Sequence, residues 1–226
     1  MGRSFGLVDY KIQEAEYFLD QLLCAGKRLN FMEVQFVGSA FVTALRSVTF
    51  AMQASLKGTT QFDDWYSLKQ AKLRNDPLAK FFHDFRTVTN HIGANLVGGG
   101  LNDRNGTKYF FLPCHDLPNV PDLDVATACQ MQFISVLELV FECYIQFATL
   151  INGQHYFTEE HFHVQGKTAE DAEEELGYPR GWTKLGLPVD AEWRWKVLRK
   201  SADGCLIAHQ FERWLNKSPP HPDDMQ

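Results

Sequence analysis

The chain has 226 residues, of which 45% are hydrophobic and 22% are charged, and its formal net charge is −6 at pH 7. This length allows one large domain, or one domain with an appendage, around a packed core, and the negative charge argues against a protein that coats nucleic acid. The charge is uneven, because residues 1–112 hold 13 Lys and Arg against 10 Asp and Glu, whereas residues 113–226 hold 9 against 18. A polyanion would therefore prefer the N-terminal half.

Five cysteines are present, an odd number without a C-x-x-C pair, which is typical of reduced thiols in a cytosolic protein. The first residues lack a basic segment followed by a long apolar run, so we expect no secretory signal. The most apolar run, residues 125–151, contains two glutamates and several glutamines, so we expect no transmembrane span. The sequence thus predicts a cytoplasmic protein that does not bind a membrane.

Apolar residues at three- and four-residue steps predict helices at 8–24, 29–57, 61–75, 76–92 and 124–152. The second helix has a polar stripe whose one charged residue is Arg46, as expected where a helix meets another helix, a second subunit or a ligand. The fourth helix opens with Asp76 as its cap and Pro77 at its first position, and Asp124 is expected to cap the fifth. The short connections predict an all-α, up-and-down bundle of four to five helices.

Residues 94–123 interrupt the helical pattern with turn residues. Three consecutive glycines at 98–100 are expected to end regular structure, and Asn105-Gly106 favours a turn. We therefore predict a β-hairpin or extended loop, in which residues 108–112 pair with 95–97. Residues 1–152 would form the bundle, and residues 153–226 a helical extension packed on it, with helices at 168–176 and 189–216.

Arg86 and His91 on the fourth helix are the strongest candidates for chemistry, with Asn90 between them. A histidine can take the proton from an RNA 2′-hydroxyl, and an arginine can hold the phosphate and stabilise its growing charge. RNA supplies its own nucleophile, so we expect neither a metal nor a cofactor. On an ideal helix the two residues are about 140° and about 7.5 Å apart, so they converge on one phosphate only if two copies of the helix meet. The alternative is that both residues are structural. His91, in the last turn, would interact favourably with the helix dipole, and the aliphatic stem of Arg86 would cover the apolar stripe.

Two segments, SAFVTALRSVTFAMQ and WYSLKQAKLRNDPLAKFFHDFRTVTNH, resemble the HEPN superfamily, the higher eukaryotes and prokaryotes nucleotide-binding domain, within residues 8–152. The resemblance implies a helical bundle that dimerises, and in many members a metal-independent endoribonuclease of toxin–antitoxin or phage-defence systems. The family motif R-x4–6-H falls on Arg86 and His91, with Asn90 as an orienting group. The family often has Asn, Asp or His directly after the arginine, whereas this chain has Thr87.

The predicted function is therefore RNA cleavage by a homodimer, with an antitoxin as an expected type of partner. Arg46, Lys80 and Thr87 would contact the substrate, although Arg46 could instead form an ion pair with Glu138 or Glu142. A non-catalytic module of the same fold that binds a nucleotide or a protein is the main alternative. A purely structural dimer is the third.

Other groups of polar residues are predicted to be structural. His155, His161 and His163 would lie in a surface loop, since no Cys pair or H-E-x-x-H pattern accompanies them. Residues 114–116, Cys-His-Asp, would also form a loop. The three glutamates at 173–175 would form a solvated face, and the tryptophans would pack in the core.

Overall fold

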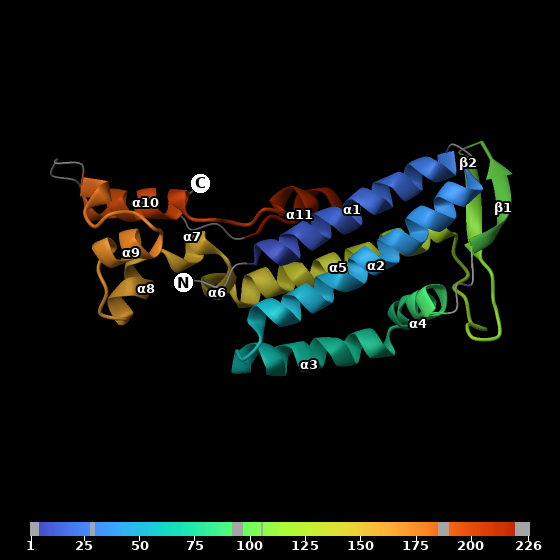
Figure 1. Cartoon of the computed structure of the whole chain (residues 1–226), viewed down its shortest axis with the longest axis horizontal. Coiled ribbons are helices and arrows are strands. Elements are labelled where there is room, and N and C mark those ends of the chain that lie inside the picture. Colours follow the sequence, from blue (N-terminus) through green and yellow to red (C-terminus); the bar gives the residue numbers. More distant parts are fainter. Residues whose placement is uncertain (1–4, 28–29, 92–96, 105, 185–189, 220–226) are drawn as a thin grey trace. The chain divides into compact units, whose positions relative to one another are not determined.

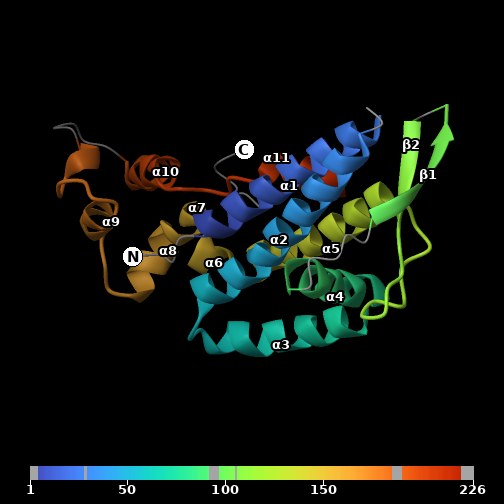
Figure 2. The ribbon, with the colours of Figure 1, turned by 45° about the vertical axis from the view of Figure 1, so that its right-hand side comes forward.

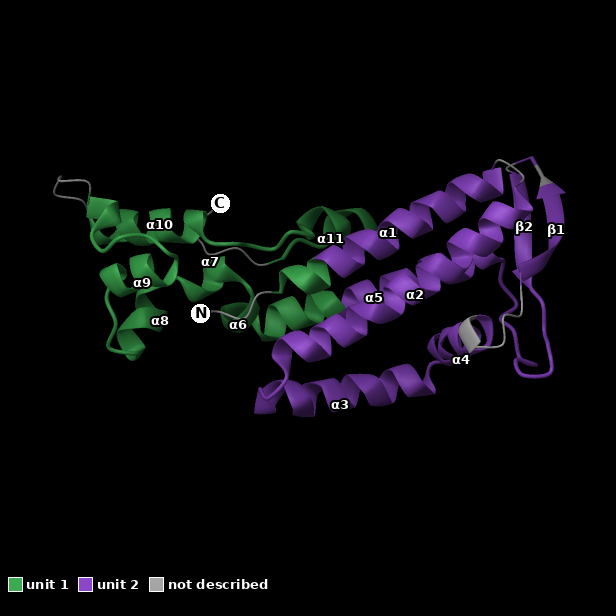
Figure 3. Cartoon of the chain, in the orientation of Figure 1, with its two compact units in different colours: residues 1–9, 140–226 green, residues 10–139 purple. Residues whose placement is uncertain are grey.

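The computed structural model describes residues 5–27, 30–91, 97–104, 106–184 and 190–219, and only the backbone of residues 90, 91 and 103. The fold is all-α with one β-hairpin, as the sequence predicts (Figure 1). The chain divides into two compact units, namely unit 1 (residues 1–9 and 140–226) and unit 2 (residues 10–139), which Figure 3 distinguishes by colour. This division falls within the first and fifth helices and not at residue 152.

Unit 2 is built on three long helices that lie side by side, with two shorter helices along the second of them (Figures 1 and 2). Their buried apolar faces follow the predicted three- and four-residue steps, for example through Phe41, Leu45, Val48 and Met52 of α2. The helices are α1 (Gly6–Lys27), α2 (Phe31–Leu56), α3 (Thr60–Asn75), α4 (Pro77–His91) and α5 (Val125–Gln146).

Side-chain caps fix where these helices begin. Asp76 Oδ1 accepts the backbone N–H groups of Leu78 at 2.8 Å and Ala79 at 3.0 Å, and Asp124 Oδ1 accepts that of Thr127 at 3.0 Å. Both caps were predicted. Asn30 caps α2 in the same way, accepting the N–H of Glu33 at 3.2 Å, a role that the predicted start at residue 29 missed.

A hairpin forms, as predicted, from β1 (Val97–Asp103) and β2 (Gly106–Phe111) in antiparallel register. The predicted pairing of 108–112 with 95–97 is right only at Val97, which lies opposite Phe111, because residues 108–110 pair with residues 98–101 instead. Residues 95 and 96 lie outside the described residues. The expectation that the three glycines end regular structure is wrong, because they lie inside β1. A bulge falls between Gly98 and Gly100, and Gly99 takes a φ of +53°, which other residues rarely adopt. A Cβ at Gly98 would lie 2.2 Å from Leu112 Cδ1, so another residue here would require the 45% exposed Leu112 side chain to shift.

Two helices, α2 and α5, are long and apolar enough to cross a membrane by length and composition alone. About half of the most apolar window of each is buried inside the structure, 50% in α2 and 56% in α5. Core helices of soluble proteins have the same properties, so the cytoplasmic location stays a prediction.

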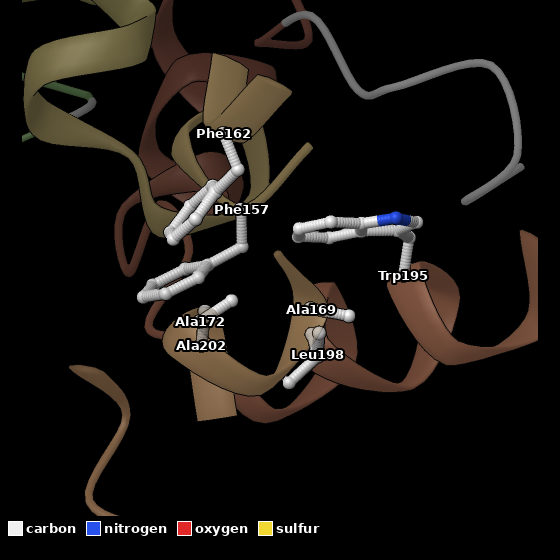
Figure 4. Close-up of a cluster of buried hydrophobic side chains, with 7 residues drawn as sticks. All are labelled: Phe157, Phe162, Ala169, Ala172, Trp195, Leu198 and Ala202. Atoms are coloured by element: carbon white, nitrogen blue, oxygen red, sulfur yellow. The ribbon is translucent and has the colours of Figure 1, made fainter. Parts of the chain in front are cut away.

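Unit 1 has its own aromatic core, shown in Figure 4. The ring of Phe162 stacks on Phe157 with centroids 5.6 Å apart and lies 5.4 Å from the ring of Trp195. Trp195 is 5% exposed, so its predicted place in the core is confirmed, whereas Trp193 is 42% exposed and the prediction is wrong for it. Unit 1 contains the short helices α6 (Ala148–Ile151), α7 (Gly153–Tyr156), α8 (Glu159–Val164), α9 (Ala169–Glu175), η1 (Trp182–Lys184), α10 (Ala191–Ser201) and α11 (Ala208–Leu215).

Two predicted elements of unit 1 are wrong. The histidine-rich segment is helical rather than a surface loop, because His155 lies in α7 and α8 is capped by Thr158, whose Oγ1 accepts the N–H of His161 at 3.2 Å. The single helix predicted at 189–216 is two helices, since α10 ends at Ser201 and α11 begins at Ala208. Gly204, which lies in the break, weakens any helix that would run through it.

The predicted solvated face at residues 173–175 is wrong for Glu173, whose side chain is fully buried. Its carboxylate accepts hydrogen bonds from the backbone of Gly181, the backbone and hydroxyl of Thr183, and the guanidinium of Arg194. Burial raises the pKa of Glu173, but these donors together lower it below its ordinary value. Glu173 therefore ties α9 to η1 and α10.

Candidate functional site

Unit 2 contains a cavity of about 490 Å³, a size typical of sites for small organic ligands. Four of its lining side chains carry a positive charge, and Asp84 carries a negative one. The rest are apolar or neutral polar groups. The lining residues come from α2 (Val42, Leu45, Arg46, Thr49), α3 (Tyr66, Gln70, Leu73, Arg74), α4 (Ala79, Lys80, Phe82, His83, Asp84, Arg86) and α5 (Gln132, Val136).

Arg86 brings a buried, unpaired donor to this cavity. Its Nε is buried, and no acceptor among the described residues makes a hydrogen bond with it. No ion pair joins its guanidinium to a carboxylate in the described ranges either. Buried N–H groups are nearly always paired, and an unpaired one costs about 1–3 kcal/mol. The arrangement is typical of a donor that a ligand satisfies.

Arg46 is the second arginine of the cavity, and it is half-buried. Its Nη1 donates to Thr49 Oγ1 at 3.0 Å, and its guanidinium carbon lies 4.4 Å from the centre of the Phe50 ring. Burial lowers the pKa of Arg46; Tyr66 acts in the opposite direction, and the positive charge of Arg86 lowers the pKa further. The two cations are therefore close enough to repel each other.

The alternative prediction that Arg46 pairs with Glu138 or Glu142 is wrong. Within the part of the chain that the structure describes, Arg46 makes no salt bridge, and its side chain instead contacts Thr49 and the Phe50 ring. Its charge is thus left for a ligand to neutralise.

Contacts with the hairpin, together with the helical period, determine which face of α4 lines the cavity. The ring of Phe111 in β2 packs against Phe81 at 4.7 Å and Phe85 at 5.4 Å, which holds one face of α4 in the core. His83 and Arg86 lie about 200° and 140° from Phe81 around an ideal helix, on the other side. Anchoring the aromatic face therefore presents these two polar side chains to the cavity.

Neutral polar groups complete the wall. Gln132 of α5 is 7% exposed and lines the cavity. The Tyr66 hydroxyl accepts from Gln53 Nε2 at 3.2 Å, which fixes the ring position. An amide offers both a donor and an acceptor, so Gln132 suits the edge of a polar ring or a sugar.

The structure brings three of the six predicted site residues, Arg46, Lys80 and Arg86, to one cavity. Thr87 is not among them: it is exposed, and its Oγ1 donates to the His83 carbonyl at 3.1 Å. Asn90 and His91 form the last two residues of α4, and their side chains lie outside the described residues.

Sequence reasoning did not assign several polar lining residues to the site, among them His83 and Gln132. His83 lies three residues before Arg86, so the helical period alone would have placed it on the same face. Gln132 comes from the strongly apolar α5, and only the packing of α5 against the other helices brings it here.

The described residues contain no group of three or more His, Cys, Asp or Glu side chains arranged to hold a metal ion. All five cysteines are free, in agreement with the predicted reduced state.

One sequence family, described as bacteriophage lambda protein ea47, matches residues 30–94. This segment contains α2, α3 and α4, and with them every lining residue except Gln132 and Val136. No curated protein and no solved structure matches the chain. The chain is therefore similar to the phage protein over less than half of its length, in the part that builds the cavity.

Proposed function

We propose that unit 2 binds a phosphate ester, supplied by a nucleotide or by RNA, between Arg46 and Arg86. The observation that carries the proposal is the buried, unpaired Nε of Arg86 beside a second half-buried arginine. A phosphate oxygen can accept from Nε, and the phosphate charge would offset the repulsion between the two guanidinium groups.

The remaining wall suits the organic part of a nucleotide. Leu45, Phe82 and Val136 are apolar and lie against the cations, so one ligand can bury a base or sugar while its phosphate is bound. Gln132 can hydrogen-bond a polar edge of that group. Arg74 and Lys80 are exposed, and they would attract an anion to the cavity.

RNA cleavage is a second candidate function, favoured because Arg86, the arginine of the R-x4-H pair, lines the cavity. In the HEPN-like version, Arg86 would hold the scissile phosphate, Asn90 would orient His91, and His91 would take the 2′-hydroxyl proton. Their separation of about 140° around α4 requires a symmetric dimer. The HEPN resemblance, the homodimer and an antitoxin partner remain predictions, as does the non-catalytic alternative.

Binding is tested by fluorescence polarisation with a labelled single-stranded RNA of 12 nucleotides, and by competition with a nucleoside 5′-monophosphate. We expect saturable binding by the parent and at least tenfold weaker binding by Arg86→Ala. The matched control is Arg104→Ala, which removes an exposed positive charge from the hairpin turn of the same unit. Competition by the monophosphate would identify a nucleotide site, and its absence an RNA site. Equal affinities of Arg86→Ala and Arg104→Ala would contradict the proposal.

A further inference from the structure

We infer that His83 is the proton acceptor of an RNA-cleaving site contained within one protomer, with Arg86 as its phosphate clamp. The inference rests on the proposed function, since it needs RNA phosphate between Arg46 and Arg86. It differs from the R-x4-H hypothesis in the residue that acts and in requiring no second copy of the chain.

Position supports His83. His83 and Arg86 both line the cavity, and His83 is its one histidine among the described residues. On α4 they are three residues apart, which places them about 60° apart around the axis and about 4.5 Å along it. Neighbouring side chains on one helical face can reach the same group, whereas positions 86 and 91 are about 140° apart on an ideal helix.

The surroundings of His83 are suited to a proton transfer. Its side chain is exposed, so it can exchange protons with solvent between turnovers. No salt bridge fixes its charge in the described ranges. The charged groups that share the cavity are Arg46, Arg74, Lys80, Asp84 and Arg86. The excess of positive charge stabilises the phosphate dianion that develops during attack.

The reaction is an internal transesterification, which needs no co-reactant. His83 accepts the proton from the 2′-hydroxyl while the 2′-oxygen forms a bond to the adjacent phosphorus. The bond from phosphorus to the 5′-oxygen breaks, and that oxygen takes a proton from solvent, to which His83 returns its own. The products are a 2′,3′-cyclic phosphate and a free 5′-hydroxyl, so atoms and charge balance.

The test measures single-turnover cleavage of end-labelled RNA of random sequence, in EDTA, by the full-length protein. We expect the parent to cleave, and His83→Ala to be at least 100-fold slower while its affinity for the same RNA changes less than threefold. The matched control is His115→Ala, which removes an exposed histidine outside the cavity. The cleavage rate of this variant is expected to equal that of the parent.

Two readouts separate a chemical role of His83 from a structural one. The parent's rate should rise as pH increases through the range in which an imidazole loses its proton, and the residual rate of His83→Ala should lack this rise. Added imidazole should restore part of the rate to His83→Ala and none to Arg86→Ala. RNA with a 2′-deoxy ribose should be bound but not cut.

Each contrary outcome has a distinct meaning. If the parent binds RNA and does not cleave it, the inference about His83 fails and the proposed function stands. If the parent binds the nucleoside 5′-monophosphate but not RNA, the inference about His83 fails and the proposed function stands, and if it binds neither ligand, both fail. If His91→Ala abolishes cleavage while His83→Ala retains it, His83 is not the proton acceptor and the dimeric arrangement takes its place.

Discussion

Arg46 of α2 and Arg86 of α4 line one cavity, and burial together with the charge of Arg86 lowers the pKa of Arg46. The two residues are 40 positions apart in sequence, yet they face a common space without an ion pair to a carboxylate in the described part of the chain. Cations are rarely brought together in this way unless an anion joins them, because each one makes the burial of the other less favourable.

Replacing Arg86 with methionine should therefore weaken RNA binding without lowering the stability of the fold. The variant keeps the apolar stem but removes a repelling charge and an unpaired donor, so we expect the free energy of unfolding to be unchanged or raised by about 1 kcal/mol. Affinity for RNA should fall at least tenfold. Urea denaturation and polarisation binding on the same samples check both. A loss of more than about 2 kcal/mol in stability would mean that Arg86 has a structural partner instead.

The Phe111→Ala variant tests whether the hairpin positions α4 at the cavity. Phe111 is 5% exposed and contacts Phe81, Phe82 and Phe85, so we expect a loss of about 3–5 kcal/mol in the free energy of unfolding. RNA affinity should also fall, since α4 loses the contact that orients its polar face. Phe110→Ala, a half-buried neighbour on the same strand, is the control and should cost less in both measurements. Equal effects of the two would show that Phe111 does not position α4.

Glu173→Gln should destabilise unit 1 by about 3 kcal/mol. One carboxylate oxygen accepts from Gly181 and the other from Thr183 and Arg194, so the NH₂ of a glutamine must face a donor on one side. Thermal unfolding should show the loss, and hydrogen exchange should place it in α9, η1 and α10. Glu174→Gln, which removes an exposed pair with Arg180, should change stability by less than about 1 kcal/mol.

Asp9 should make the stability of unit 1 depend on pH. Burial raises the pKa of Asp9 from 3.8 to about 6, although hydrogen bonds from the Tyr144 hydroxyl and the Leu206 backbone act in the opposite direction. Because the folded state holds the proton more tightly, this contribution to stability is fully present below pH 3.8. It is lost as the pH rises through about 6, by about 3 kcal/mol in total.

Asp9→Asn isolates this contribution, because it removes the titrating group at a buried position. Urea denaturation of the parent and the variant at pH 4.5, 6 and 7.5 should give a difference in stability that shifts by about 2–3 kcal/mol in favour of the variant with rising pH. A difference that stays constant over this range would contradict the raised pKa of Asp9. Comparing the two proteins at each pH cancels the contributions of groups such as Glu173, whose lowered pKa acts in the opposite direction.

The helices were predictable because their signals are local. Asp76, Pro77 and the spacing of Phe81, Phe82 and Phe85 define α4 without any knowledge of its neighbours. Asn105-Gly106 marked the hairpin for the same reason. The place of the three glycines in β1 was not predictable, since it depends on a bulge and on the space left by the Leu112 side chain.

The site was only partly predictable because it is assembled from four helices. The R-x4-H motif drew attention to Arg86, and the polar stripe of α2 to Arg46, but spacing within one segment cannot show that Gln132 lines the same cavity. Glu173 gives the same lesson in unit 1. Three consecutive glutamates are normally solvated. The hydrogen-bond donors that make the burial of Glu173 favourable come from Gly181 and Thr183, eight and ten residues later, and from Arg194 of α10.

The most direct test of the two-arginine site is the NMR signal of the Arg86 Nε–H group, assigned by its absence in Arg86→Lys. A titration with single-stranded RNA and a second one with a nucleoside 5′-monophosphate would follow this signal. Hydrogen bonding to a phosphate oxygen should move it downfield and slow its exchange with water as the site fills, in at least one of the two titrations. A signal that stays unchanged while both ligands bind to saturation, or protein that binds neither ligand, would contradict the account.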